Sequence, residues 1–152
     1  MANITPTFTL TCSDLFSSNL STSATATISV AAADSGNLQR VSCDDNPQAA
    51  GAGILIPLSG VLKIAAAKKI FVYIKHTGIE DDGSTASASD TVVIRNATKG
   101  EEGINIVLAP NEFAFFPLGA GLHISTAEFG GGLAITKGGA NVMVDYAYFT
   151  QA

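Results

Sequence analysis

The residues that could do metal or acid–base chemistry are few and lie far apart in this sequence. The chain has two histidines, His76 and His123, and each stands alone in its expected strand. A metal centre needs several converging ligands, typically two or three imidazoles with a carboxylate. We therefore expect no metal site, and we expect both histidines to lie on a surface or at an interface.

The acidic residues form short clusters without the spacing of a known site. Glu80–Asp82 precede Gly83 and could offer oxygen ligands to calcium, but they lack the alternating acidic pattern of a calcium loop. We expect this cluster, and the pair Glu101 and Glu102, to face water in turns. Asp145 differs because it falls within a predicted strand. A charge there indicates protection of a sheet edge or an ion pair with another subunit, and a catalytic role has no partner residue in view.

Nucleophilic chemistry is equally weakly supported. No serine stands in a G-x-S-x-G turn, and Gly130–Gly132 lead into a predicted strand, whereas a phosphate-binding loop leads into a helix. Cys12 and Cys43 do not have zinc-site spacing and are expected to be thiols. The sequence therefore predicts no catalytic residue, no cofactor and no enzyme activity.

One aromatic segment, LAPNEFAFFPLGAG, gives a more informative pattern. Ala109–Glu112 is predicted to be a turn, because its proline presets φ and its asparagine tolerates the left-handed region. In the strand that follows, Phe113 and Phe115 should point to one face, and Ala114 and Phe116 to the other. Large rings on both faces favour a strand covered on both sides, by the core and by another subunit. A locally thick core is the alternative.

The rest of the chain predicts short strands separated by turns rich in glycine. Alternation of period 2 is strongest in Lys69–His76 and Asn141–Thr150. Other strands are expected at Ile4–Thr11, Thr22–Val30, Val61–Ile64, Thr91–Asn96, Ile104–Ala109, Glu112–Leu118, Leu122–Ser125 and Leu133–Thr136. Ala31–Gly53 should be mostly loop, Thr77–Asp90 a polar hairpin loop, and Ala65–Lys69 at most one helical turn. The expected fold is all-β: a jelly-roll-like antiparallel β-sandwich at residues 21–152 with an extended N-terminal arm at residues 1–20.

The amino-acid composition limits the kinds of partner that the chain can have. Only 14% of its 152 residues are charged, against about 25% in an ordinary soluble domain. Such a surface suits a protein that is largely covered by neighbours, since charge is depleted at interface cores. The net charge of −5 argues against a nucleic-acid partner. No apolar run is long enough for a membrane span and no signal-peptide pattern is present, so we expect cytosolic synthesis.

Four segments follow one another between Lys68 and Phe149: KKIFVYIKHTG, TVVIRN, LAPNEFAFFPL and VDYAYF. This order resembles small virion structural proteins of tailed bacteriophages. In those proteins, K-x-hydrophobic-x-(Y/V)-I-K-N/H-T-G precedes L-x-P-(G/N)-E-F-x-F-(F/L)-P-(L/V) and a closing V-(D/E)-Y-A-hydrophobic-F. Asn111 stands at the position after the proline where the pattern also has glycine. The first 60 residues lie outside the resemblance.

The resemblance implies a sandwich that works by binding, as a capsid decoration (cement) protein of the virion. The implied partners are the major capsid protein or another virion protein, in a homotrimer whose N-terminal arm orders across capsid subunits, with no nucleic acid and no membrane. The expected contact residues are Ile4, Phe8, Leu10, Phe113, Phe115, Phe116, Tyr146 and Tyr148. Two alternatives stay open: a tail, neck or fibre-associated protein, and a carbohydrate-binding module for host recognition. The lack of Trp weighs against the sugar alternative, because sugar sites favour exposed Trp and Tyr.

Overall fold

The computed structural model describes residues 2–12, 20–30, 36–43, 54–57, 69–96, 105–118 and 132–151. Within these ranges the structure has strands and turns but no helix, and the strands pair antiparallel. The strands are β1 (Ala2–Ile4), β2 (Thr7–Cys12), β3 (Leu20–Thr25), β4 (Ile28–Val30), β5 (Gly36–Cys43), β6 (Ile54–Pro57), β7 (Ile70–Glu80), β8 (Val92–Asn96), β9 (Asn105–Leu108), β10 (Phe113–Leu118), β11 (Gly132–Lys137) and β12 (Val142–Thr150). The predicted all-β, antiparallel class is confirmed. The expected strands at Val61–Ile64 and Leu122–Ser125 lie outside the described residues.

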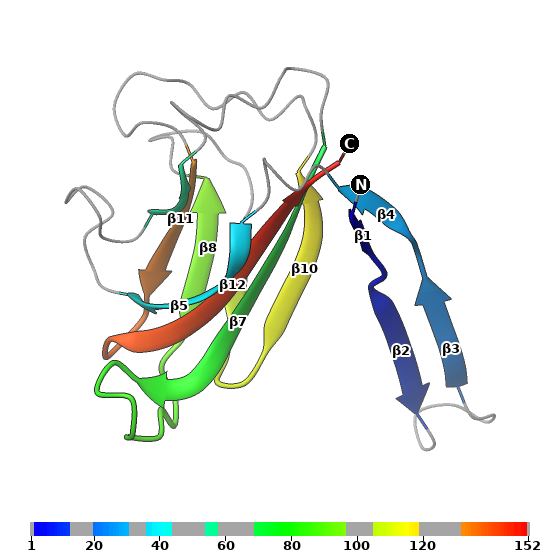
Figure 1. Cartoon of the computed structure of the whole chain (residues 1–152). Helices are drawn as coiled ribbons and strands as arrows, with labels where there is room; N and C mark the ends of the chain where they lie inside the picture. Colours follow the sequence, from blue (N-terminus) through cyan, green and yellow to red (C-terminus); the bar gives the residue numbers. More distant parts are fainter. Residues whose placement is uncertain are drawn as a thin grey trace.

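Two four-stranded sheets make up the body of the molecule (Figure 1). One has the order β10-β7-β12-β5 and the other β6-β11-β8-β9. A single cluster of buried side chains draws on both sheets, with Ile74 from β7, Val144 from β12 and Ile94 from β8 among its members. The two sheets therefore share one apolar core, and burial of that core is the main force that holds them together.

Strand β7 is the central element of the first sheet and shows why the sequence pattern was informative. It pairs with both β10 and β12, and its residues from Ile70 to Gly78 alternate strictly between buried and half-buried positions. This is the period-2 pattern of a strand with a dry inner face and a second, partly covered face. The expected strand at Lys69–His76 is confirmed, and it continues to Glu80, into the segment that was expected to be a loop.

The expectation that Ala31–Gly53 would be mostly loop is wrong over β5. This strand pairs along β12, from Val142 with Cys43 to Tyr148 with Gly36. Among the side chains of this strand that the structure describes, only Val41 and Cys43 contribute to the core, while Leu38–Arg40 are exposed. Two inward apolar residues are too short a run to produce a visible alternation, so the strand is specified by its partner rather than by its own pattern.

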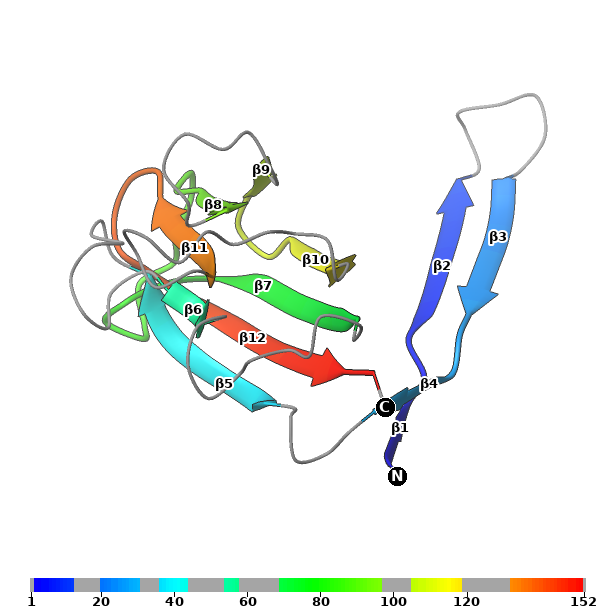
Figure 2. The same ribbon diagram turned by 90° about the horizontal axis from the view of Figure 1, so that it is seen from above.

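The N-terminal strands form a long two-stranded ribbon that stands away from the two sheets (Figures 1 and 2). Near the body β1 pairs with β4, and further out β2 pairs with β3; the amide of Ala26 donates to the carbonyl of Pro6 between the two pairs. Val30 is buried and bridges to Gln151 beside the end of β12, which fixes the base of the ribbon. The predicted strand at Thr22–Val30 is thus confirmed as β3 and β4. The domain boundary after residue 20 stays a prediction, although strands on both sides of it pair with each other.

Candidate functional site: an aromatic face and a projecting ribbon

The outer side of the β10-β7-β12-β5 sheet carries a group of aromatic rings. The ring of Phe71 stacks on that of Phe115, with centroids 5.9 Å apart and planes 11° apart. Tyr73 meets Phe113 at 6.2 Å with a tilt of 37°. Register places Phe149 beside Phe71 on the same side of the sheet. We call these five residues the aromatic face.

The aromatic face is partly open to solvent. Phe113 is 59% exposed, and Phe71, Tyr73 and Phe115 are half-buried. Burial raises the pKa of the Tyr73 phenol, which is consistent with a ring that is already partly removed from water. At one end of the face, the ammonium group of Lys69 lies 5.9 Å from the centroid of the Phe71 ring. Exposed aromatic area of this kind is typical of a surface that another molecule covers.

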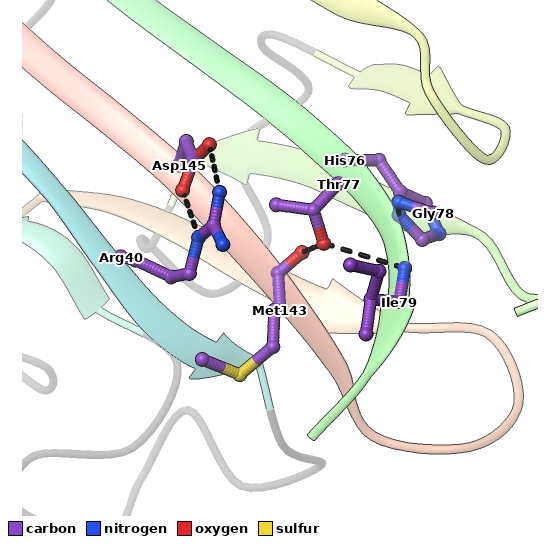
Figure 3. A network of polar contacts seen from close by, with 7 residues as sticks. All are labelled: Arg40, His76, Thr77, Gly78, Ile79, Met143 and Asp145. Carbon is purple, nitrogen blue, oxygen red and sulfur yellow. Dashed lines mark hydrogen bonds and ion pairs between the residues drawn. The ribbon is translucent and has the colours of Figure 1, made fainter. Parts of the chain in front are cut away.

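A row of charged residues borders the aromatic face. Arg40 on β5 donates from Nε and Nη2 to the two carboxylate oxygens of Asp145, at 2.6 and 2.8 Å (Figure 3). This two-pronged hydrogen bond, with the nearby charge of Lys75, holds the pKa of Asp145 below its usual value. Both interpretations offered for Asp145 are corrected. Its strand β12 lies between β7 and β5 rather than at an edge, and Arg40, its ion-pair partner, belongs to the same chain.

The ribbon is a second exposed surface, and its described residues carry no charge. Phe8 is 58% exposed, and the described side chains of Ser21–Thr27 are all exposed. Hydroxyls pair across it: Thr7 Oγ1 lies 3.3 Å from Thr25 Oγ1. Register continues this hydroxyl ladder with Thr9 opposite Ser23.

The sequence-predicted contact residues divide into three groups. Phe8, Phe113 and Phe115 lie on the two exposed surfaces just described. Phe116, Tyr146 and Tyr148 instead face the chain's own core, where Tyr146 is buried and its hydroxyl donates to Gln39 Oε1 at 2.8 Å. Ile4 is half-buried in β1 opposite Ile28, and Leu10 pairs through its backbone with Thr22 in the ribbon. The expected opposition of Phe113 and Phe115 to Phe116 is therefore confirmed.

His76 is fully buried, so the expectation that it lies on a surface or at an interface is wrong. Its Nδ1 accepts from the amide of Gly78 at 3.0 Å, and an amide can only donate. The proton must then be on Nε2, which lies 3.1 Å from the carbonyl oxygen of Asp90. Nδ1 thus supports the backbone within β7, and Nε2 ties β7 to the loop that follows it. His123 lies outside the described residues.

The backbone that His76 supports is a bulge in β7 (Figure 3). Pairing with β12 shifts between Val142 and Val144, and Gly78 has a φ of 77° in the left-handed region. The hydroxyl of Thr77 donates to the carbonyl of Met143 at 2.8 Å and accepts from the amide of Ile79. A side chain at Gly78 would also meet Asn111, whose Oδ1 would lie 2.6 Å from the added Cβ. The left-handed backbone therefore favours glycine at this position, and any side chain there would also force that of Asn111 to move.

Ser87, His76 and Asp90 lie close together, but their connections do not make a catalytic triad. The hydroxyl of Ser87 donates to the Asp90 carboxylate at 2.7 Å, and His76 contacts only the backbone carbonyl of Asp90. A triad needs the histidine between the nucleophile and the acid. Ser87 and His76 are also buried, so no substrate reaches them. The hydrogen bonds from Ser87 and the amide of Ala140 lower the pKa of Asp90, as a structural carboxylate.

The carboxylates of Asp82 and Glu112 stabilise turns, while Glu101 and Glu102 lie outside the described residues. Asp82 accepts from the amides of Ser84 and Thr85 and from the Thr85 hydroxyl, and these bonds lower its pKa to about 2. Glu112 accepts from the amide of Ala109 at 2.8 Å and so closes the predicted turn before β10. Among the residues that the structure describes, no three His, Cys, Asp or Glu side chains are placed to hold a metal ion.

Sequence reasoning missed the residues that complete the aromatic face. Phe71, Tyr73 and Phe149 were noted only as strand residues. The signal was available in part, because Phe71 and Tyr73 occupy the outward positions of a strand whose inward residues are Ile and Val. Their contact with Phe113 and Phe115 depends on the pairing of β7 with β10, which a single sequence does not give.

Comparison with protein-family models, curated proteins and solved structures finds no match to this chain. No helix among the described residues is long and apolar enough to cross a membrane.

Proposed function

We propose that this chain is a structural protein of a tailed-phage virion, which decorates the capsid and stabilises the head shell through protein–protein contacts. The observation that carries the proposal is the aromatic face. Five rings on the outer side of a sheet leave apolar area that a protein working alone would cover with polar residues. The resemblance of residues 68–149 to virion proteins favours a virion as the assembly to which the chain belongs.

The fold supports a binding role in a second way. Two antiparallel sheets around one core support the expected jelly-roll-like sandwich, which is part of this proposal. In the described residues, the buried side chains of His76 and Ser87 and the half-buried side chain of Thr77 use their polar atoms in hydrogen bonds within the chain. These polar groups are thus used for structure, which supports a role that depends on the exposed surface.

The test is binding to isolated virion parts. Purified chain is added to head shells and, separately, to tails from a phage whose copy of this gene is deleted, and bound chain is measured after sedimentation. Saturable binding to shells, with greater resistance of the shells to heat, is the expected result. Binding to tails alone would replace the decoration role with the tail or neck role, and binding to neither would refute the virion assignment.

Carbohydrate binding is the second candidate, and the aromatic face gives it one favourable observation. Tyr73 is half-exposed among other rings, as in a stacking platform for a sugar. Against it, Arg40 and Asp145 beside the face already bond to each other, so they are not free to bind sugar hydroxyls. A glycan array with the purified chain separates this candidate from the virion role.

A further inference from the structure

The outer half of the ribbon lacks support from its own chain. An isolated two-stranded hairpin is marginally stable in water, since it buries too little apolar area to offset its conformational entropy. Described side chains along β2 and β3, including Phe8, are exposed, and both views show the ribbon standing clear of the sheets (Figures 1 and 2). A stable ribbon of this form needs a surface from another molecule.

The aromatic face has the chemistry and size to provide that surface. No described ribbon residue is charged, so the ribbon can be buried on aromatic rings without stranding an unpaired charge. Strand β2 has six residues and spans about 20 Å at about 3.4 Å per residue. The outermost strands of the four-stranded sheet lie about 14 Å apart at about 4.8 Å per strand. The ribbon is therefore long enough to cross the whole face.

The ribbon does not cover the aromatic face of its own chain. Its base is fixed by the bridge between Val30 and Gln151, next to the end of β12, and from there it extends away from the body (Figure 2). Phe71 and Phe149 pair at this same end of the sheet. The ribbon thus starts beside the aromatic face of its own chain and stands clear of it, free to meet another molecule.

We infer that the ribbon of one copy docks through its Phe8 side on the aromatic face of a second copy. The inference rests on the proposed function, in which the chain works through protein–protein contacts, and it assigns the aromatic face to the contact between copies of the chain. Such a contact joins two different surfaces, so it repeats from copy to copy and either closes into a ring or grows into a fibre. Closure after three copies produces the expected homotrimer.

Two variants, each disabling one side of the contact, test the inference. Phe8→Asp disables the ribbon and Phe113→Asp disables the face; both residues are more than half exposed, so the fold should survive. Molar mass is measured by light scattering on purified full-length chain. The wild type should be an oligomer, and each variant alone should have the mass of one 15.5 kDa chain. An equimolar mixture of the two variants should form a heterodimer, because one partner retains an intact ribbon and the other an intact face.

A matched control and the other outcomes complete the test. Val107→Asp changes a residue that is 54% exposed on the other sheet and should leave the oligomer intact. A monomeric wild type, an oligomer that survives Phe8→Asp, or a mixture that stays monomeric would each overturn the inference. If an aspartate variant is recovered unfolded by circular dichroism, Phe8→Ser and Phe113→Ser take its place. No capsid is present, so failure here is distinguishable from failure to bind head shells.

Discussion

The two faces of β7 differ in a way that composition alone does not reveal. The inner face carries Ile70, Val72 and Ile74, each at most 2% exposed. The outer face carries the larger rings of Phe71 and Tyr73, and both stay half-exposed. A sheet that served only to enclose a core would place polar side chains outside. The apolar surface of this strand therefore serves folding on its inner side, and we propose that it serves association on its outer side.

The ribbon and the body also differ in the interactions that hold them together. The body is held by a core shared between two sheets, whereas the outer ribbon is held by strand pairing and hydroxyl contacts such as that of Thr7 with Thr25. Local structure with few buried apolar contacts opens at lower free energy than the core. The ribbon should consequently exchange its amide protons faster than the body until a partner covers it.

The largest expected effect contrasts the two faces directly. Ile74→Ala removes a fully buried side chain at the centre of the core and should lower the free energy of unfolding by about 2–5 kcal/mol. Phe115→Ser, on the outer face, should cost about 1 kcal/mol, mainly from the stack with Phe71, yet it should reduce association. Urea denaturation measures the first quantity and light scattering the second. Equal losses of stability would show that the outer face belongs to the folding core.

His76 gives an intermediate effect on the inner face. His76→Leu keeps a bulky buried side chain but leaves the Gly78 amide and the Asp90 carbonyl without partners. An unsatisfied buried polar group costs about 1–3 kcal/mol, so a loss in that range is expected in urea denaturation. His76→Gln, which can donate and accept, is the matched control and should recover part of the loss. If both variants are as stable as the wild type, the bulge does not depend on the ring.

The sequence was sufficient where local geometry decides the structure. The turn before β10 was predicted from its proline and asparagine, and Asn111 indeed has a φ of 69°, with Glu112 donating from its amide to Ala109 at 3.0 Å. The opposition of Phe113 to Phe116 follows from the two-residue period of any strand. These features need no knowledge of what lies across the sheet.

The sequence was insufficient where a distant partner decides. His76 is at an inward position of β7, but its hydrogen bond to Asp90 depends on how the loop after β7 folds back. In the sequence, Asp145 stands among apolar residues. In the structure it bonds to Arg40, which is 105 positions away along the chain. Likewise, β5 is a strand because β12 offers it an edge. Strand pairing and register depend on residues far apart in the chain, so they are difficult to predict from one sequence.

The smallest expected effect concerns the charged row beside the aromatic face. Arg40→Gln removes the partner that lowers the pKa of Asp145, so the titration midpoint of this carboxyl should rise toward 3.8, as followed by carboxyl NMR. Because the folded pKa is depressed, the pair stabilises the fold above the ordinary carboxyl pKa. This contribution is lost as the pH falls through the lower, folded value. The variant should therefore differ from the wild type near neutral pH and converge with it in acid.

The size of this stability loss shows how much the charged row contributes compared with the aromatic rings. Exposed ion pairs contribute little to stability because water and salt screen them, and Arg40 is 54% exposed. The loss at neutral pH should be smaller than that of Phe115→Ser, and added salt should reduce it further. Lys75→Gln, which removes a charge near Asp145 but no hydrogen bond to it, should move the midpoint less. A larger effect from Arg40→Gln than from Phe115→Ser would mean that charge, rather than aromatic packing, holds the outer face in order.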